Sequence, residues 1–384
     1  MTEGRAVTEG GTPVTEWGDG TRCVHAGSAE PVAGQPFLAG PVLAAPYHLG
    51  PGQLGTDDFY GRAGNPTWRA LESAIGALDG GLCTVFPSGM AAITTLLRTV
   101  VSAGDVIVVP ADGYYLVRTF LAGLDVEARE VPTVGPWTPE VVEGARLVLL
   151  ETPSNPGLDV CDIRAVAELA HAAGALVAVD NTTATPIGQR PLELGADVAV
   201  ASDTKAVAGH SDVLFGHISV TDEALWAELQ RQRSLSGAIP GPFETWMVHR
   251  GLGTLDVRLA RQAENAAALV AKLRGHEAVA NVRWPGSPDD PSHAIASRQM
   301  RRFGGVFTFE LASADVVARF LANSRLVASA TSFGGLHSTA DRRAQWGDPV
   351  SEGLVRFSAG LEDSHDLVTD VVGALDRALE SPVQ

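Results

Sequence analysis

Short apolar runs rich in β-branched residues alternate with helical stretches through the middle of the chain, and this alternation limits the possible folds more than any other feature. The runs occupy residues 106–109, 147–150, 176–179 and 198–200, and helical patterns such as 163–173 separate several of them. Strands that are apolar on both faces and joined by helices form parallel sheets covered on both sides. The sequence therefore predicts an α/β fold with a mainly parallel sheet.

Two helices are predicted before these strands. Asn65 is a favourable N-cap, Pro66 suits the first helical turn, and Gly80 follows the last residue of the apolar-periodic stretch. A second helix is predicted to begin near Ser88.

The length of 384 residues predicts two domains. The first 50 residues are rich in Gly, Pro and Ala without a sustained period, which indicates an extended arm. A long helix from about Phe243 leads into a region with its own strand at 306–310 and a closing helix from Asp366. The expected boundaries are 1–50 for an N-terminal arm, 51–255 for a large domain and 256–384 for a small C-terminal domain.

Composition excludes several classes of protein. A net charge of −17 argues against a nucleic-acid surface, and no apolar run approaches the ~20 residues of a membrane helix. The first residues, MTEGRAVTEGG, lack the basic and apolar regions of a signal peptide. Cys23, Cys83 and Cys161 are far apart and without metal-ligand spacing. We expect a cytoplasmic protein with no bound metal and no nucleic-acid or membrane partner.

Lysine is scarce in this chain. Of its 28 basic residues only Lys205 and Lys272 are lysines, so the other 26 are arginines. An arginine cannot replace a lysine where an amine must lose its proton and attack a carbonyl. Lys272 lies on the polar side of an amphipathic helix, so we expect it to be solvated. Lys205 is the candidate nucleophile.

Polar residues follow three of the predicted strands. Asn155 follows the first, Asp180 the second, and Ser202, Thr204 and Lys205 the third. In an open parallel sheet the carboxyl ends of the strands share one edge, and ligands bind there. This edge therefore collects an amide, a carboxylate, two hydroxyls and the unusual lysine. Such a set suits pyridoxal phosphate (PLP), a phosphorylated cationic ring that a lysine can hold as a Schiff base.

Each group has a chemical reason to be there. Asp180 would pair with the protonated ring nitrogen, and the hydroxyls of Ser202 and Thr204 would bind the phosphate. The phosphate would also accept from the free amides at a helix N-terminus, here those of Ser88, Gly89 and Met90.

Three further residues complete the predicted site. Asn155 would bind the phenolic oxygen of the ring, Tyr114 would stack on the ring face, and Arg356 would bind an amino-acid carboxylate. Taken singly, each site residue has an ordinary explanation, such as a helix cap, a turn, half-buried packing or a solvated strand face. Their order along the chain and their shared sheet edge favour the cofactor.

Several ordered motifs resemble the Cys/Met-metabolism family of PLP-dependent enzymes. They are residues 60–67 (YGRAGNPT), 88–90 (SGM), 151–156 (ETPSNP), 179–182 (VDNT), 202–212 (SDTKAVAGHSD) and 354–363 (LVRFSAGLED). The resemblance runs from about Thr21 to near the C-terminus. It implies the aspartate-aminotransferase-like fold, fold type I of PLP enzymes, and a homotetramer built as a dimer of dimers. It also implies that Tyr60 and Arg62 bind the phosphate in the neighbouring subunit's site.

The resemblance implies a γ-lyase of sulfur amino acids. Cystathionine or methionine would lose its γ-thiol and give 2-oxobutanoate and ammonia. Lys205 would attach the cofactor and move the α-proton, and Tyr114 would act as a general acid or base. Arg356, Asn155 and the Ser332 region would bind the substrate carboxylate.

The chain departs from the family pattern at four places. Ala206 follows the lysine where the family has Tyr, and Tyr115-Leu116 replace the Gly-Cys pair of methionine γ-lyases. Thr331 stands where cystathionine γ-lyases tend to have Glu, and the segment around His337 is shortened. Without that Glu the distal ammonium of cystathionine loses a partner, while the neutral tail of methionine loses nothing.

Three alternatives remain open at this point. Within the family, the chain could carry out γ-replacement on an O-acylhomoserine, as cystathionine γ-synthase does. A dinucleotide-binding oxidoreductase is a second class, since residues 50–55 (GPGQLG) fit the glycine fingerprint, although they follow no predicted strand. The third is a non-catalytic scaffold, against which the intact Lys205, Asp180 and Arg356 argue.

Overall fold

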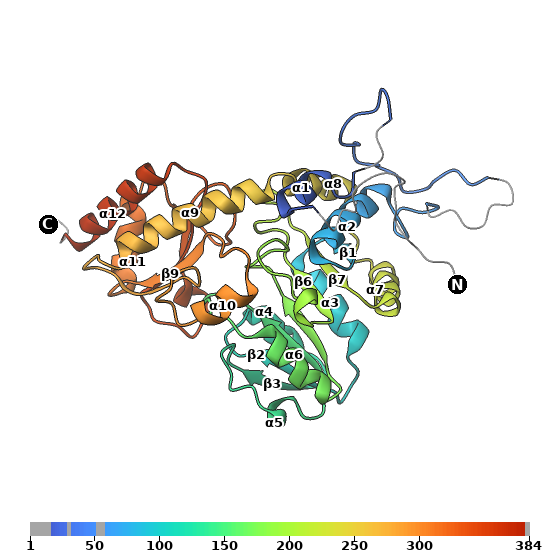
Figure 1. The fold of residues 1–384 in the computed structure, drawn as a ribbon, viewed down its shortest axis with the longest axis horizontal. Helices are drawn as coiled ribbons and strands as arrows, with labels where there is room; N and C mark the ends of the chain where they lie inside the picture. The colour runs from blue at the N-terminus through green and yellow to red at the C-terminus, as the bar shows by residue number, and fades with distance from the viewer. Residues whose placement is uncertain (1–16, 29–31, 51–57, 381–384) are drawn as a thin grey trace.

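The computed structural model describes residues 17–28, 32–50 and 58–380, and this part of the chain contains two β-sheets (Figure 1). The larger sheet has seven strands in the order β1-β7-β6-β5-β4-β2-β3. Their bounds are β1 Leu82–Phe86, β2 Val106–Pro110, β3 Glu127–Val131, β4 Ala145–Glu151, β5 Leu176–Asp180, β6 Val198–Ala201 and β7 Gly216–Val220. The predicted fingerprint at 50–55 lies mostly outside the described residues.

Strands β3, β2, β4, β5 and β6 pair in parallel, as the alternation of strands and helices predicts. Strand β7 runs antiparallel to both of its neighbours, β6 and β1. The chain returns from β6 to β7 through the loop 202–215 without a crossover helix, so the returning strand has to be antiparallel. This loop carries Lys205.

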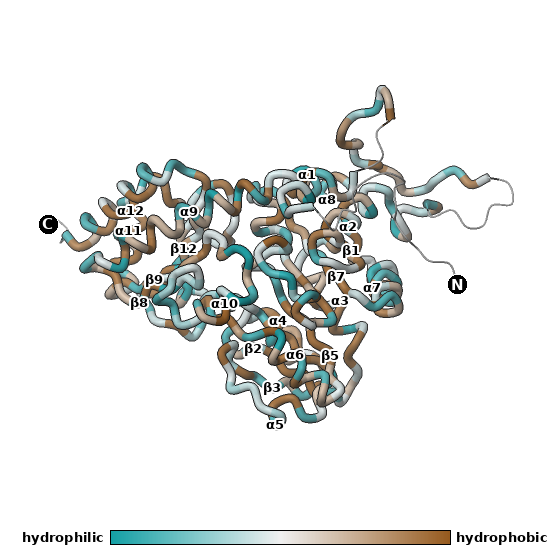
Figure 2. The backbone as a smooth tube through the Cα atoms, in the orientation of Figure 1, coloured by the Kyte–Doolittle hydropathy of each residue, from teal (hydrophilic) through white to brown (hydrophobic). Residues whose placement is uncertain are grey.

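Helices cover both faces of the large sheet. One face packs on α3 (Gly89–Val100), α4 (Tyr115–Leu121) and α7 (Glu223–Ser236). The other face packs on α6 (Ile163–Ala172) around the centre and on α2 (Pro66–Asp79) and α8 (Pro242–Leu252) near β1 and β7. A short helix, α5 (Pro139–Val142), precedes β4, and a 3₁₀ turn, η2 (Leu192–Leu194), precedes β6. Hydrophobic residues follow the buried strands between these layers (Figure 2).

The predicted helix starts are confirmed. The Asn65 side chain accepts a hydrogen bond from the Thr67 amide at 2.8 Å and caps α2, and Gly80 ends this helix with a φ of +82°. Ser88 caps α3 by accepting from the Ala91 amide at 3.0 Å.

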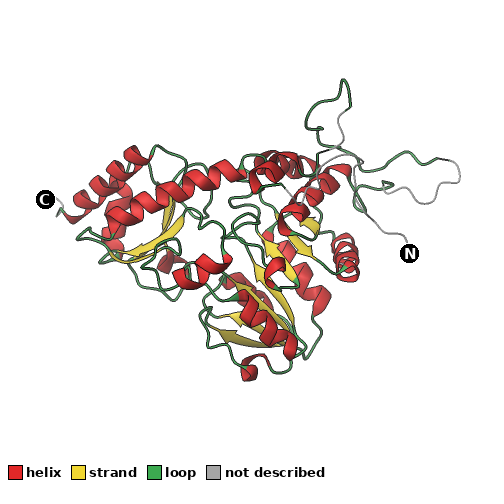
Figure 3. Ribbon diagram, in the orientation of Figure 1, coloured by secondary structure: helices red, strands yellow, loops and turns green. Residues whose placement is uncertain are grey.

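The smaller sheet belongs to the C-terminal part of the chain (Figure 3). Its strands, in the order β10-β11-β12-β9-β8, are β8 Ala280–Arg283, β9 Val306–Glu310, β10 Ala328–Ser329, β11 Thr339–Arg342 and β12 Leu354–Ser358. Helices α9 (Leu255–Leu273), α11 (Ala314–Asn323) and α12 (Ser364–Leu379) pack with this sheet around one core. Helix α10 (His293–Gln299) and the 3₁₀ turn η3 (Arg343–Trp346) complete the region.

Two predictions need correction. The long helix predicted from Phe243 is two helices, α8 and α9, because a turn at Gly253 and Thr254 interrupts the helical conformation. The expected extended arm contains helix α1 (Asp19–His25), whose Cys23 is buried against the core beneath α2. The proposed division at 255/256 stays a prediction; it falls at the first residue of α9. Among the described residues, no helix is both long and apolar enough to cross a membrane.

Candidate active site

A cavity of about 690 Å³ opens at the carboxyl edge of β4, β5 and β6, next to the smaller sheet. It brings together predicted residues from both sheets: Ser88, Gly89, Met90, Tyr114, Asn155, Asp180, Ser202, Thr204, Lys205, Ser332 and Arg356. Its lining also includes residues that we did not predict: Ile93, Tyr115, Glu151, Thr182, Thr183, Leu214, Phe333, Arg343 and Trp346. Thr331, expected to shape the distal pocket, lines it as well.

Lys205 lies in the loop that follows β6. Its amide donates to the Ser202 carbonyl at 3.2 Å, and among the described residues no hydrogen bond is found for its amine. The amine lies 5.6 Å from the centre of the Phe333 ring. Burial and the nearby Arg356 cation lower the pKa of Lys205 to about 8, while Asp180 acts in the opposite direction. The neutral form of the amine is therefore far more populated near physiological pH than it is for an ordinary lysine.

Asp180 is the last residue of β5 and is buried. Its Oδ1 accepts from the Thr182 amide at 2.9 Å. Burial raises its pKa, and hydrogen bonding to Thr182 and the charges of Lys205 and His217 oppose that rise. A cationic ring nitrogen placed here would supply the counter-charge that this buried carboxylate favours.

Glu151 is a second buried carboxylate in the cavity. One of its oxygens accepts from the Tyr114 amide at 2.6 Å and the other from the Asn155 amide at 2.9 Å. Burial and the neighbouring Asp180 raise its pKa well above the ordinary value. Glu151 thus positions two predicted site residues. Its place at the end of β4 was the available signal, because the other strand-end carboxylate, Asp180, was predicted on that ground.

The N-terminus of α3 forms one wall of the cavity. A Cβ atom at Gly89 would lie 2.6 Å from the Ser202 Cβ, so only a glycine lets the helix start this close to the end of β6. This approach brings free helix amides and the Ser202 side chain together in a cradle that fits a phosphate. Thr204 is partly engaged, since its hydroxyl accepts from the Phe215 amide at 3.0 Å and donates to the Phe215 carbonyl at 3.2 Å.

Arg356 comes from β12 and faces these residues across the cavity. Its guanidinium donates to Asn155 Oδ1 at 2.7 Å and to the Ser332 carbonyl at 3.2 Å, and lies 3.6 Å from Asp341. Only 4% of its surface is exposed. Burial, with the neighbouring Arg343 cation, lowers its pKa to about 10, so it remains charged at neutral pH. This geometry suits the binding of a carboxylate.

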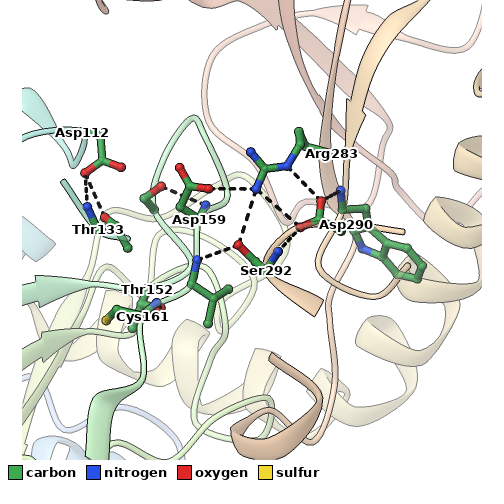
Figure 4. Close-up of polar contacts among 11 residues, drawn as sticks. Asp112, Thr133, Thr152, Asp159, Cys161, Arg283, Asp290 and Ser292 are labelled. Carbon is green, nitrogen blue, oxygen red and sulfur yellow. Dashed lines mark hydrogen bonds and ion pairs between the residues drawn. The ribbon is translucent and has the colours of Figure 1, made fainter. Parts of the chain in front are cut away.

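The loop 152–161, which carries Asn155, is also held to the smaller region at a second place (Figure 4). Arg283 donates to Asp159 at 2.8 Å and to Asp290 at 3.0 Å. The Ser292 hydroxyl accepts from the Val160 amide at 3.1 Å. We call Asp159, Arg283, Asp290 and Ser292 the Arg283 cluster.

Arg343 and Trp346 belong to η3, which no periodic pattern in the sequence indicates. Arg343 makes ion pairs with Asp341 at 2.9 Å and Asp348 at 2.6 Å. The Trp346 indole donates to Asp341 at 2.9 Å. The Arg343 charge is therefore neutralised by its own segment.

Tyr60 and Arg62 do not line this cavity. Tyr60 is 45% exposed, and Arg62 donates to the Ser234 carbonyl at 3.2 Å. The Arg62 guanidinium lies 5.5 Å from the centre of the Tyr60 ring. Within one chain these two side chains are thus directed to the surface.

The residues present fit PLP. Three features surround one cavity: a lysine amine with a lowered pKa, a buried carboxylate, and a helix N-terminus whose close approach to β6 requires glycine. They would hold the aldehyde, the ring nitrogen and the phosphate, respectively.

Comparison with known proteins indicates the same cofactor. The sequence profile described as Cys/Met metabolism PLP-dependent enzyme matches residues 21–376. A Streptomyces coelicolor protein, provisionally named cystathionine γ-lyase, is 51% identical over 98% of both chains. A cystathionine γ-synthase of Mycobacterium tuberculosis is 38% identical over 94% of this chain and 97% of its own. The structure of a methionine γ-lyase from Micromonospora echinospora superposes with a TM-score of 0.89 at 36% identity, covering 94% of this chain and 99% of that one. The α/β fold that the resemblance implied is confirmed.

Proposed function

We propose that this chain, which belongs to the Cys/Met metabolism family of PLP-dependent enzymes, is a carbon–sulfur lyase that cleaves the Cγ–S bond of sulfur amino acids. Its products would be a thiol, ammonia and 2-oxobutanoate. The observation that carries the proposal is the meeting of Lys205, Asp180 and the Arg356–Asn155 pair in one cavity. The 51% identity to the Streptomyces coelicolor protein supports a lyase.

The substrate would bind first through its carboxylate. Arg356 presents a charged fork that Asn155 and the Ser332 carbonyl hold in place. This fork orients the amino acid so that its α-carbon faces Lys205.

The cofactor would be held by Lys205, Asp180 and the α3 cradle of Ser88, Gly89, Met90 and Ser202, with Thr204 beside it. Bound PLP supplies an electron sink that stabilises negative charge on the substrate carbons. An ionised Asp180 keeps the ring nitrogen protonated, which this sink requires.

Two side chains would move protons. The Lys205 amine, with a pKa of about 8, takes the α-proton near neutral pH and passes a proton between substrate carbons. Burial raises the pKa of the Tyr114 phenol, so Tyr114 holds its proton at neutral pH and can give it to the leaving sulfur.

The distal wall favours an uncharged side chain on the substrate. Leu214, Thr331 and Trp346 are among the residues that line the cavity. Among the described lining residues the carboxylates are Glu151 and Asp180, and both have the roles given above. The ammonium at the far end of cystathionine thus lacks a carboxylate partner, whereas the methionine tail needs none. We infer that methionine is the better of these two substrates.

Steady-state rates of 2-oxobutanoate release from methionine, cystathionine and homocysteine test the proposal. We expect turnover of methionine, and none in a Lys205→Ala variant. A Lys205→Ala variant that turns over normally would contradict the assignment of the lysine.

Gamma-replacement is the second candidate, because the Mycobacterium tuberculosis relative is named a cystathionine γ-synthase. Both reactions need the same cavity residues and differ in what captures the intermediate. Supplying an O-acylated homoserine with cysteine separates them. Cystathionine formed faster than 2-oxobutanoate would favour γ-replacement over our proposal.

We further propose a cytoplasmic homotetramer built from two dimers. The exposed position of Tyr60 and Arg62 supports the dimer, since both lie at the surface, where a neighbouring chain's phosphate cradle can meet them. The three cysteines, which lie far apart in the sequence, support the cytoplasmic location.

A further inference from the structure

A buried cluster of charged side chains lies beneath the loop that carries Lys205. His217 Nδ1 lies 2.8 Å from Asp203, and its Nε2 lies 3.0 Å from Asp79. The Ser219 hydroxyl donates to the same Asp79 oxygen at 2.5 Å. All four side chains are at most 1% exposed. We call Asp79, Asp203, His217 and Ser219 the His217 cluster.

The two neighbouring carboxylates favour the doubly protonated form of His217. Each ring nitrogen is within hydrogen-bonding distance of a carboxylate, and ionised carboxylates only accept. Burial raises the pKa of Asp203, and the charge of His217 opposes that rise. When both carboxylates are ionised, both nitrogens donate and the ring is an imidazolium. Burial alone would lower the pKa of His217, but Asp203 and Asp79 together raise it to about 10.

The cluster is poorly arranged for stability alone. Two carboxylates share one cation, and Asp79 Oδ1 is buried with no hydrogen-bond partner among the described residues. Apolar side chains of similar volume often replace buried charges without loss of stability. A function other than holding the core together would explain why these charges are present.

The position of the cluster indicates that function. Asp203 lies two residues before Lys205, and its carbonyl accepts from the Ala208 amide at 2.9 Å. His217 pairs across the sheet with Ala201, the residue at which β6 ends and the loop begins. The bond between Asp203 and His217 therefore holds the first turn of the loop against β7.

A second contact holds the same turn to the segment that enters β7. Thr204 exchanges hydrogen bonds with Phe215, two residues before His217. Lys205 thus follows two successive residues that are both fixed to the segment entering β7. Its backbone is constrained while its amine remains directed into the cavity.

We propose that His217 is a positioning residue for the reaction: through Asp203 it fixes the loop 202–205, so that the Lys205 amine is held in place for the cofactor and the substrate. The inference rests on the proposed role of Lys205 but not on which amino acid is cleaved. The charge of His217 also supports cofactor binding in a second way, because it favours the ionised form of Asp180.

The test compares two variants that each remove one buried carboxylate from its cationic partner. Asp203→Asn breaks the cluster at the loop. Glu72→Gln breaks the buried pair between Glu72, which lies on α2 as Asp79 does, and Arg233, 2.6 Å away. The hydrogen bonds described for this pair go to Val85 and not to the loop. Stability, kcat, KM and the rate at which borohydride fixes PLP to Lys205 are measured in the loaded enzymes.

We expect both variants to unfold at lower temperature. Asp203→Asn should lower kcat at least tenfold with KM within about twofold, and should slow fixation of PLP at Lys205, whereas Glu72→Gln should leave kcat and fixation unchanged. Equal effects of the two variants on kcat and fixation would reduce His217 to a structural role and overturn the proposal. Fixation of PLP by borohydride needs no substrate, so it tests the positioning role of His217 even if the proposed lyase activity is wrong.

The wild-type protein gives an independent test if Asp203→Asn does not fold. All four members of the cluster are side chains of this chain that bond to one another, so hydrogen exchange of the peptide 202–209 should be slow both with and without PLP. Fast exchange of that peptide in the cofactor-free protein would mean that the cofactor, rather than His217, orders the loop. That result would overturn the proposal.

Discussion

At the scale of single residues, burial decides the chemistry of the two lysines. Lys272 is exposed on α9, as its position on the polar helix face predicted. Lys205 lies inside the cavity beside Arg356, and its pKa is lowered to about 8. The same type of side chain is exposed to solvent at one position and, at the other, lies in the cavity as the proposed nucleophile.

Cofactor attachment should therefore speed up with rising pH. The neutral amine is the reactive form. The rate at which Lys205 of the cofactor-free protein forms a Schiff base with added PLP should therefore rise through a midpoint near pH 8. Because the Arg356 cation helps lower that pKa, the midpoint should move to higher pH in Arg356→Gln. Stopped-flow absorbance measures the midpoint in the wild type and in the variant. A wild-type midpoint near the ordinary value of a lysine would contradict the assigned environment.

Arg356→Lys should weaken substrate binding more than it slows chemistry. A lysine cannot make the two contacts to Asn155 and the Ser332 carbonyl that hold the guanidinium plane. Losing a charged hydrogen bond costs about 1.5–3 kcal/mol, which predicts a KM roughly 10–100-fold higher. Arg319→Lys, on α11 and away from the cavity, is the control. A lower kcat at unchanged KM would argue against carboxylate binding by Arg356.

Residues of rare chemistry could be predicted from the sequence, whereas residues that act through tertiary contacts could not. The scarcity of lysine indicated Lys205, and the strand-end position indicated Asp180. The strand-end position of Glu151 was also available, but its role depends on a tertiary contact, the hydrogen bond from the Tyr114 amide. Arg343 could not be found, since neither its spacing nor its neighbours mark it as a cavity residue.

At the scale of elements, the sequence predicted those whose local signals agree with their tertiary setting. The caps of α2 and α3 and the strands β2, β4, β5 and β6 are of this kind. Strand β3 was missed because its sequence EAREV has no apolar pattern, which suits the sheet edge where it lies. The antiparallel direction of β7 depends on the loop before it, and no residue type encodes that.

The junction of α3 with β6 should not accept a side chain. In Gly89→Ala the new Cβ would lie 2.6 Å from the Ser202 Cβ and 3.0 Å from its Cα, so the helix start must shift away from the strand. Overpacking of this kind costs about 1–3 kcal/mol. We expect a roughly 5–100-fold loss of PLP affinity in a titration of the visible absorption band.

Gly123→Ala is the matched control for this substitution. Gly123 is exposed, and its nearest contact would be the Phe120 carbonyl at 3.4 Å. It should bind PLP like the wild type. Unchanged affinity in Gly89→Ala would show that the phosphate does not lie at the α3 N-terminus.

At the scale of the whole molecule, the proposed active site is shared between the two sheets. Asn155 comes from the loop after β4 and Arg356 from β12, 201 positions later in the chain. The Arg283 cluster joins the same loop to the smaller region at Asp159 and Val160 (Figure 4). The distance between Asn155 and Arg356 thus depends on how this loop is held.

Asp159→Ala should raise KM about tenfold and leave PLP binding unchanged, because the loop would lose its ion pair with Arg283 while the phosphate cradle is untouched. The control is Arg298→Gln, which removes an exposed ion pair with Asp162 between the same two regions. Such exposed pairs contribute about 0–1 kcal/mol, so KM should not change. Equal KM values for the two variants would dismiss a positioning effect of the Arg283 cluster.

A site completed by a second chain makes a prediction about mixtures of subunits. Arg62 is exposed and bonded to Ser234, whereas Lys205 lines the cavity of its own chain. Arg62→Ala and Lys205→Ala should each be inactive alone. Random mixing puts half of the dimers in mixed form, and each mixed dimer has one intact site of two, so activity should return to about a quarter of the wild-type value.

Mixing Lys205→Ala with Asp180→Asn provides the control for this experiment. Both residues line the cavity of one chain, so every site in those mixed dimers keeps a defect and no activity should return. Native mass spectrometry verifies that the mixed dimers form. Because mixed dimers differ from their parents only in which chain supplies each residue, recovery with Arg62→Ala and not with Asp180→Asn can arise only from a residue supplied across the interface. If neither mixture recovers although mixed dimers are present, Arg62 acts within its own chain, and the proposed sharing of the site is wrong.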